Sequence, residues 1–107
     1  MAKKTIPKTI LRDIQRLIKE LNKDDICIQR AILFGSYVSG KTHEYSDIDL
    51  ALVSHDFFFF LFEDNLRMTK ATLRFNDRIE THPYTPDDFE YSPFARDEIL
   101  AHGIDVL

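Results

Sequence analysis

The chain has 107 residues, of which 44% are apolar and 30% charged, and its formal net charge is -4. This length corresponds to one domain, and the apolar content is too high for a disordered chain. Because Lys and Arg form no block beyond Lys3-Lys4, the composition argues against a protein that binds the phosphate backbone of nucleic acid. We expect a single folded domain over residues 1–107.

The N-terminus and the cysteine content both point to a cytoplasmic protein. Residues 1–10 lack the apolar core of a signal peptide, and no apolar run approaches the ~20 residues that span a bilayer. The single cysteine, Cys27, cannot form an internal disulfide, and its apolar neighbours predict a buried side chain. We therefore expect the chain to reside in the reducing cytoplasm.

The first half of the sequence predicts one helix and two strands. Apolar residues recur at helical spacing from Lys8 to Asn22, which predicts an amphipathic helix. Residues Ile26 to Phe34 are nearly continuously apolar and predict a strand covered on both faces. A turn or short helical segment over 36–40 and a polar connection over 41–46 then lead to a second strand, Asp47 to Val53.

A helix is expected next, capped by Ser54 or Asp56 and running to about Leu73. The run Phe57 to Phe62 contains six consecutive apolar residues, which surround every side of a helix, so that one core cannot cover them all. This run therefore belongs either to the core or to an interface with a second copy of the chain or with another protein.

The last third of the chain predicts one strand and one helix. Residues Asn76 to Tyr84 predict a short strand ended by Pro83, and Thr85 to Phe94 predict a loop because Pro86 and Pro93 interrupt it. A helix from Phe94 to His102 is expected to end at Gly103, with a short tail over 104–107.

Two nucleotide-binding patterns overlap in the segment Gly35 to Leu50, "GSYVSGKTHEYSDIDL". Gly35 to Thr42 fits the P-loop pattern G-x-x-x-x-G-K-[ST], which requires a long helix after the loop. Only four residues separate Thr42 from the strand at Asp47, and they form barely one helical turn, which cannot cross back over a sheet. The context therefore argues against a P-loop.

The second pattern places Asp47 and Asp49 on one face of a strand, because side chains alternate with period two. Paired carboxylates in one cleft repel each other, and a divalent cation such as Mg²⁺ or Mn²⁺ relieves the repulsion. Glu80 on the next strand is a candidate third ligand. Gly35 and Ser36 follow the preceding strand, where backbone amides and a hydroxyl can donate to a triphosphate, and Lys41 is a candidate phosphate contact.

Gly35-Ser36 followed after ten residues by Asp47-x-Asp49 resembles the DNA polymerase beta-like nucleotidyltransferase superfamily, and the short chain resembles its minimal nucleotidyltransferase branch. The resemblance implies an α/β (α+β) fold in which a small mixed sheet is backed by helices. It also implies two Mg²⁺ ions held by Asp47, Asp49 and Glu80, with nucleotide phosphates at Gly35 and Ser36. Glu80 would help to deprotonate the attacking hydroxyl.

The resemblance further implies a reaction and a partner. A nucleoside monophosphate, AMP from ATP, would be joined to a protein hydroxyl while pyrophosphate leaves. Minimal nucleotidyltransferases commonly pair with a small helical HEPN ribonuclease toxin, so the implied role is that of an antitoxin.

The chain departs from the family pattern in two places. Tyr37-Val38-Ser39 offers no basic residue where many relatives carry one, and Glu80 stands where Asp is common. Two alternatives therefore stay open: a binding module that neutralises its partner by occlusion, and transfer to a small molecule. The histidines show no metal-ligand spacing among themselves and are expected to be surface or loop residues: His43, His55, His82 and His102.

Overall fold

The computed structural model describes residues 6–35, 38, 47–57 and 61–107, and side chains from residues 61–64 are outside this description. Its sheet contains β1 (Arg30–Phe34), β2 (Ile48–Val53), β3 (Ile79–Tyr84) and β4 (Ile104–Asp105), in the order β3-β2-β1-β4. β1 runs antiparallel to β2 and β4, whereas β2 and β3 are parallel. The expected small mixed sheet is confirmed.

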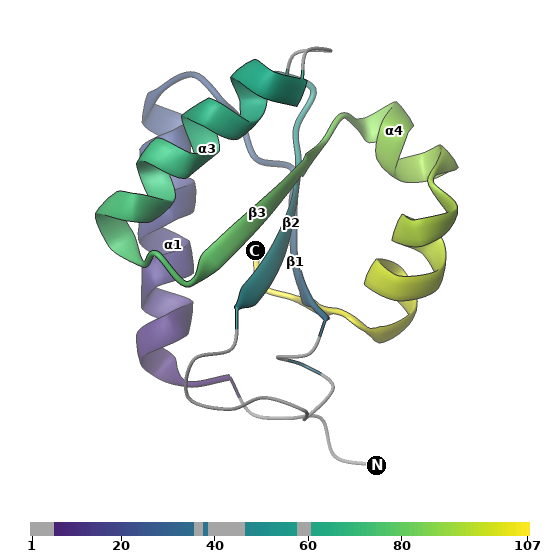
Figure 1. The fold of residues 1–107 in the computed structure, drawn as a ribbon, viewed down its shortest axis with the longest axis horizontal. Coiled ribbons are helices and arrows are strands. Elements are labelled where there is room, and N and C mark those ends of the chain that lie inside the picture. The colour runs from purple at the N-terminus through teal and green to yellow at the C-terminus, as the bar shows by residue number, and fades with distance from the viewer. Residues whose placement is uncertain (1–5, 36–37, 39–46, 58–60) are drawn as a thin grey trace.

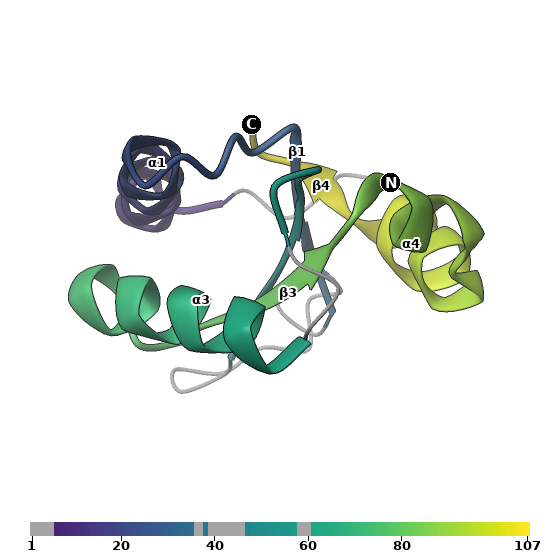
Figure 2. The same ribbon diagram turned by 90° about the horizontal axis from the view of Figure 1, so that it is seen from above.

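Helices cover both faces of this sheet (Figures 1 and 2). One face carries α1 (Lys8–Lys23) and α3 (Leu61–Phe75), and the other carries α4 (Pro86–Tyr91) and the π-helix η1 (Ala95–Leu100). None of the helices in the described part of the chain is long and apolar enough to cross a membrane.

Alternating side chains of the central strands supply two separate apolar cores. Leu33 and Leu50 belong to the core under α1 and α3, whereas Phe34 and Ala51 belong to the core under α4 and η1. The prediction that the apolar strand before Gly35 is covered on both faces is therefore confirmed. Asp49 lies between Ile48 and Leu50 in sequence, so the same alternation directs it to the α4 and η1 face.

The predicted N-terminal helix is confirmed, but the strand that follows is shorter than expected. Asp25 adopts a positive φ of 64° after α1, and pairing begins only at Arg30, opposite Val53. Residues 26–29 lie outside β1 because β2 ends at Val53 and the chain turns at Ser54, although the Gln29 amide still donates to the Val53 carbonyl at 2.8 Å. In this irregular segment Cys27 is exposed, so the prediction of a buried thiol is wrong.

The helix predicted from Ser54 or Asp56 begins later than expected. Ser54 accepts a hydrogen bond from the Asp56 amide at 3.0 Å and, through its carbonyl, one from the Phe57 amide at 3.3 Å. These bonds form a turn, and the helix α3 starts at Leu61. Phe57 is buried in the core, while Phe58 to Phe60 lie outside the described residues, so the interface prediction for this run remains a prediction.

The loop predicted for Thr85 to Phe94 is wrong, because its first half forms α4. The Thr85 hydroxyl accepts a hydrogen bond from the Asp88 amide at 3.1 Å, and Pro86 occupies the first turn, where a missing N–H costs nothing. Two acidic residues in that turn also favour a helix N-terminus. Pro86 thus starts a helix rather than interrupting the chain.

The C-terminal helix is confirmed over residues 93–102, and its middle part is η1. The predicted tail is wrong in one respect, since Ile104 and Asp105 form β4 beside β1. The predicted third strand is confirmed but includes Pro83, which a strand tolerates when it lies at the edge of a sheet, as β3 does.

Candidate active site

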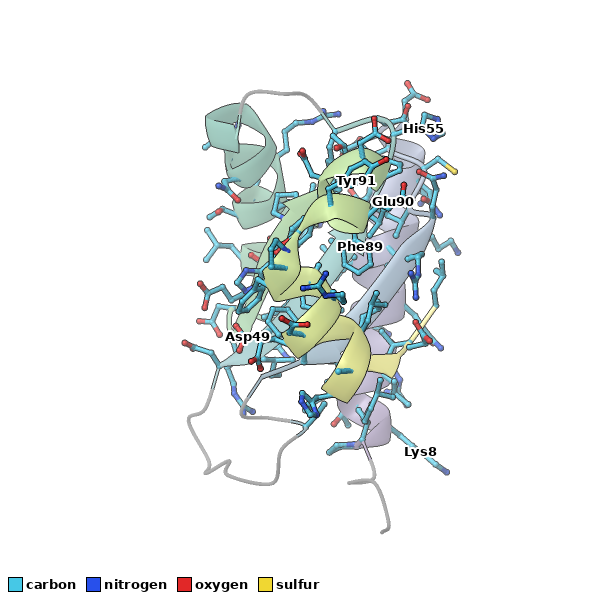
Figure 3. The ribbon with its side chains drawn as sticks, turned by 90° about the vertical axis from the view of Figure 1, so that its right-hand side faces the viewer. Lys8, Asp49, His55, Phe89, Glu90 and Tyr91 are labelled. Carbon is cyan, nitrogen blue, oxygen red and sulfur yellow. The ribbon has the colours of Figure 1, made fainter. Side chains whose placement is uncertain are left out.

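The candidate site lies where β1 ends and β2 and β3 begin. Gly35 follows Phe34 with a φ of +80°, a conformation that side-chain-bearing residues rarely adopt. A β-carbon at Gly35 would also collide with Asp49 Oδ2. Glycine is therefore required both by the backbone turn and by the carboxylate that lies against it. Figure 3 labels Asp49 at the end of the sheet opposite His55.

The parallel pairing of β2 and β3 brings the predicted carboxylates together. Asp49 and Glu80 are register partners, and Cα atoms of neighbouring strands lie about 4.8 Å apart. Residues in register in a parallel pair present their side chains to the same face of the sheet. The expectation that Glu80 lies beside Asp49 on an adjacent strand thus agrees with the structure.

His82 joins the two carboxylates, although the spacing of the histidines predicts a surface or loop residue. It lies on β3 two residues after Glu80, and its Nε2 is 3.1 Å from Asp49 Oδ1. Its ring meets Phe34 edge-on, with centroids 5.0 Å apart and planes at 64°. The signal was present in the sequence as Glu80-x-His82 on one strand, because period two puts both side chains on one face.

One potential ligand atom from each of Asp49, Glu80 and His82 lies within 4.8 Å of the others. In the described part of the chain this is the group of three ligands that comes together, and Asp47 lies outside it. Asp47 is exposed and precedes β2, which begins at Ile48 rather than at the predicted Asp47. The structure therefore groups Asp49 with Glu80 and His82, and the metal role of Asp47 remains a prediction.

Asp47 and Glu80 instead share the wall of an adjacent cavity of about 470 Å³. The cavity lies between the start of β3 and the helix α3, and its lining is largely polar. The remaining lining residues are Asn65, Thr69, Thr72, Leu73, Asp77, Arg78, Ile79 and Thr81. The cavity offers hydroxyl, amide and charged groups, and Glu80 is the member of the cluster that lines it.

The predicted phosphate contacts are described only in part. Gly35 lies against Asp49, whereas Ser36 and Lys41 are outside the described residues. Their assignment to nucleotide binding remains a prediction. Val38, between them, packs against the core under α1 and α3.

The donor set of the cluster fits a divalent cation. Two carboxylates supply the hard oxygen donors that Mg²⁺ and Mn²⁺ bind, and an imidazole nitrogen is a common ligand of transition metals. The Asp49 and His82 side chains retain 22% and 32% of their exposure, so the group is open to solvent ions. The arrangement can therefore hold a cation.

Comparisons with known proteins bear on the fold and on the family. A solved structure of a toxin-antitoxin with AMP-PNP contains a chain that is 20% identical, with a TM-score of 0.63, over 91% of this chain and 72% of that chain. This likeness supports the fold, and no curated protein sequence matches significantly. A family model described as "Nucleotidyltransferase domain" matches residues 12–106, which confirms the resemblance drawn from Gly35-Ser36 and Asp47-x-Asp49. The chain belongs to the nucleotidyltransferase domain family.

Proposed function

We propose that the chain is a magnesium-dependent nucleotidyltransferase that moves AMP from ATP onto a hydroxyl of another protein. The observation that carries this proposal is the register of Asp49 with Glu80, at the strand ends where Gly35 leaves room for the Asp49 carboxylate. The match to the nucleotidyltransferase family supplies the reaction type.

One set of residues would bind the metal ions and another would bind the nucleotide phosphates. Asp47, Asp49 and Glu80 would hold the cations, which supply charge neutralisation for the triphosphate when bound. Gly35, Ser36 and Lys41 would bind the phosphates through backbone amides, a hydroxyl and an ammonium group. These assignments follow the pattern Gly-Ser, ten residues, Asp-x-Asp.

Glu80 is the residue we assign to the acceptor, because its carboxylate belongs to the cluster and the residue also lines the adjacent cavity. It would accept the proton of the attacking hydroxyl as that oxygen bonds to the α-phosphorus. The bond between the α-phosphorus and the bridging oxygen breaks, and pyrophosphate leaves. The cavity of about 470 Å³ is the place where an acceptor side chain can approach.

The proposed acceptor belongs to a small HEPN-type ribonuclease toxin, which would make this chain the antitoxin. The fold is similar to a chain in a toxin-antitoxin structure with AMP-PNP, which supports a partner protein and an adenine nucleotide. A small molecule is the alternative acceptor, and a partner or a second copy in a homodimer could contribute to its pocket. We place the reaction in the cytoplasm.

Occlusion without catalysis is the second candidate. Asp49 Oδ1 already contacts His82, and Tyr37-Val38-Ser39 contains no basic residue to meet a phosphate. A binding module with this fold would neutralise its partner without chemistry.

The deciding experiment incubates the chain with its copurifying protein, Mg²⁺ and each labelled nucleoside triphosphate in turn, followed by intact mass of both proteins. We expect the partner to gain one nucleoside monophosphate, and Asp49→Asn to abolish the gain. The matched control is Asp105→Asn, which removes a 74% exposed carboxylate at the opposite edge of the sheet and should leave transfer unchanged.

Two results would contradict the enzyme proposal. Transfer that persists in Asp49→Asn would remove the metal role of that carboxylate. Neutralisation of the partner by the Asp47→Asn, Asp49→Asn double variant, with no mass change in either protein, would establish occlusion instead.

A further inference from the structure

We propose that His82 is a direct metal ligand of this site, and that its nitrogen makes the site select a first-row transition-metal dication such as Mn²⁺ over Mg²⁺. The inference rests on the metal-dependent activity proposed above and goes beyond it, because the pattern Asp47-x-Asp49 with Glu80 supplies oxygen donors alone. His82 adds a nitrogen donor to these oxygen donors.

The position of the imidazole suits a shared cation. Ligands at neighbouring corners of an octahedron with metal-ligand bonds of about 2.1 Å are about 3.0 Å apart. His82 Nε2 and Asp49 Oδ1 are 3.1 Å apart, and the Glu80 carboxylate lies within 4.8 Å of both. Without a metal, this separation corresponds to a hydrogen bond between His82 and Asp49. The same separation fits two neighbouring ligands of an octahedral ion, so both side chains can bind one ion with little movement.

The imidazole is also held in place by a packed ring. Phe34 is buried and meets the His82 ring edge-on, and Phe34 in turn meets Phe94 at 5.9 Å between centroids and 77° between planes. A ligand fixed by its neighbours loses less rotational freedom when it binds a metal. Phe34 therefore prepares His82 for coordination.

The selectivity follows from the donor set. Mg²⁺ prefers oxygen ligands and keeps several waters, whereas imidazole suits transition metals, whose affinity for nitrogen-containing sites rises from Mn²⁺ upward. Two carboxylates with one imidazole should bind Mn²⁺ more tightly than Mg²⁺. Replacing the imidazole by an amide should return the site to an all-oxygen set.

The test measures metal binding to the whole chain after removal of metals, with no nucleotide present. Free Mn²⁺ is counted by electron paramagnetic resonance, Mg²⁺ is measured by its competition, and echo modulation by ¹⁴N reports an imidazole bound directly to Mn²⁺. We expect wild type to favour Mn²⁺ by at least about tenfold, and His82→Gln to reduce this ratio at least about fivefold. The ¹⁴N modulation should disappear in His82→Gln and in His82→Ala.

Controls locate the ion and separate this inference from the enzyme proposal. His102→Gln removes an exposed histidine and should change neither the ratio nor the modulation, while Asp49→Asn should abolish tight Mn²⁺ binding. Wild-type Mn²⁺ without ¹⁴N modulation, or modulation that survives His82→Gln in a folded protein, would overturn the ligand assignment. Mn²⁺ bound through His82 with no nucleotide transfer would instead overturn the proposed function alone.

Discussion

Gly35→Ala tests the close approach of the turn after β1 to the Asp49 carboxylate. Two costs are expected. A positive φ disfavours alanine by about 1–2 kcal/mol, whatever its surroundings. The new β-carbon also collides with Asp49 Oδ2, and moving that carboxylate breaks its contact with His82, which costs about 0.5–1.5 kcal/mol. The sum is roughly 2–3 kcal/mol, or a melting temperature lower by on the order of 10 °C.

A double-mutant cycle separates the two costs. In the Asp49→Ala background the carboxylate is gone, so Gly35→Ala should cost only the backbone cost of about 1–2 kcal/mol. The difference between the two backgrounds, about 1 kcal/mol, exceeds the additivity error of ~0.5 kcal/mol for independent sites. Urea denaturation followed by circular dichroism supplies the four free energies of unfolding. Equal costs in both backgrounds would refute the contact between the turn and Asp49.

Gly103→Ala is the matched control for this cycle. A β-carbon at Gly103 would collide with Ile99 O and Ile32 Cγ2, and it would lie 2.9 Å from Leu33 O. This substitution should also destabilise the fold, because neither backbone carbonyl can move freely. Its cost should be the same with and without Asp49→Ala, since none of these atoms belongs to Asp49.

Two further predictions concern the helix α4 and the strand before it. Thr85→Ala should lower the free energy of unfolding by about 0.5–2 kcal/mol because it removes the N-cap. Thr85→Ser keeps the capping hydroxyl and should retain most of that free energy, as measured by urea denaturation. Equal losses in the two variants would contradict the cap. Burial raises the pKa of Tyr84 above its ordinary value of 10.0. The folded state then binds that proton more tightly, so stability should fall as pH rises above about 10, less steeply in Tyr84→Phe; identical slopes would contradict this linkage.

The elements of the fold that the sequence predicts well are those set by local periodicity. Apolar residues recur at helical spacing over Lys8 to Asn22, and this pattern predicts a helix from the segment alone. The observed helix α1 agrees closely with that range. The start of β1 depends instead on where its partner ends, because residues 26–29 lack a strand opposite them once β2 stops at Val53. Strand limits of this kind are set by pairing and are not visible in one segment alone.

The helix α4 illustrates a different limit. The helix start consists of a capping residue, a proline and two acidic residues, Thr85-Pro86-Asp87-Asp88. Because proline can either begin a helix or interrupt one, Pro86 alone does not indicate this start. Similarly, residues 104–107 carry no strand pattern of their own, and Ile104 pairs because β1 has a free edge there. Both errors arise where the role of a residue depends on its position relative to a neighbouring element.

For the candidate site, spacing predicts the pairing of Asp49 and Glu80 but misses His82. The spacing among the histidines carries no signal, because the relevant partner of His82 is Glu80, two residues earlier on the same strand. The register of β3 against β2 brings His82 within reach of Asp49. This register depends on how the two strands pair and cannot be derived from the sequence of either strand alone. Asp47 lies one residue before β2, and its place beside Asp49 remains a prediction from strand alternation.

Asp49 contributes both to the contacts that stabilise the fold and to the proposed metal site. Its carboxylate lies against Gly35 of the turn after β1, contacts His82 of β3 and stands in register with Glu80. Two neighbouring carboxylates repel each other in the absence of a cation, so this arrangement is poorly explained as a contribution to folding alone. A bound cation attracts both carboxylates and offsets their repulsion. The Gly35 cycle and the Mn²⁺ titration therefore examine the same carboxylate, first as part of the fold and then as a ligand.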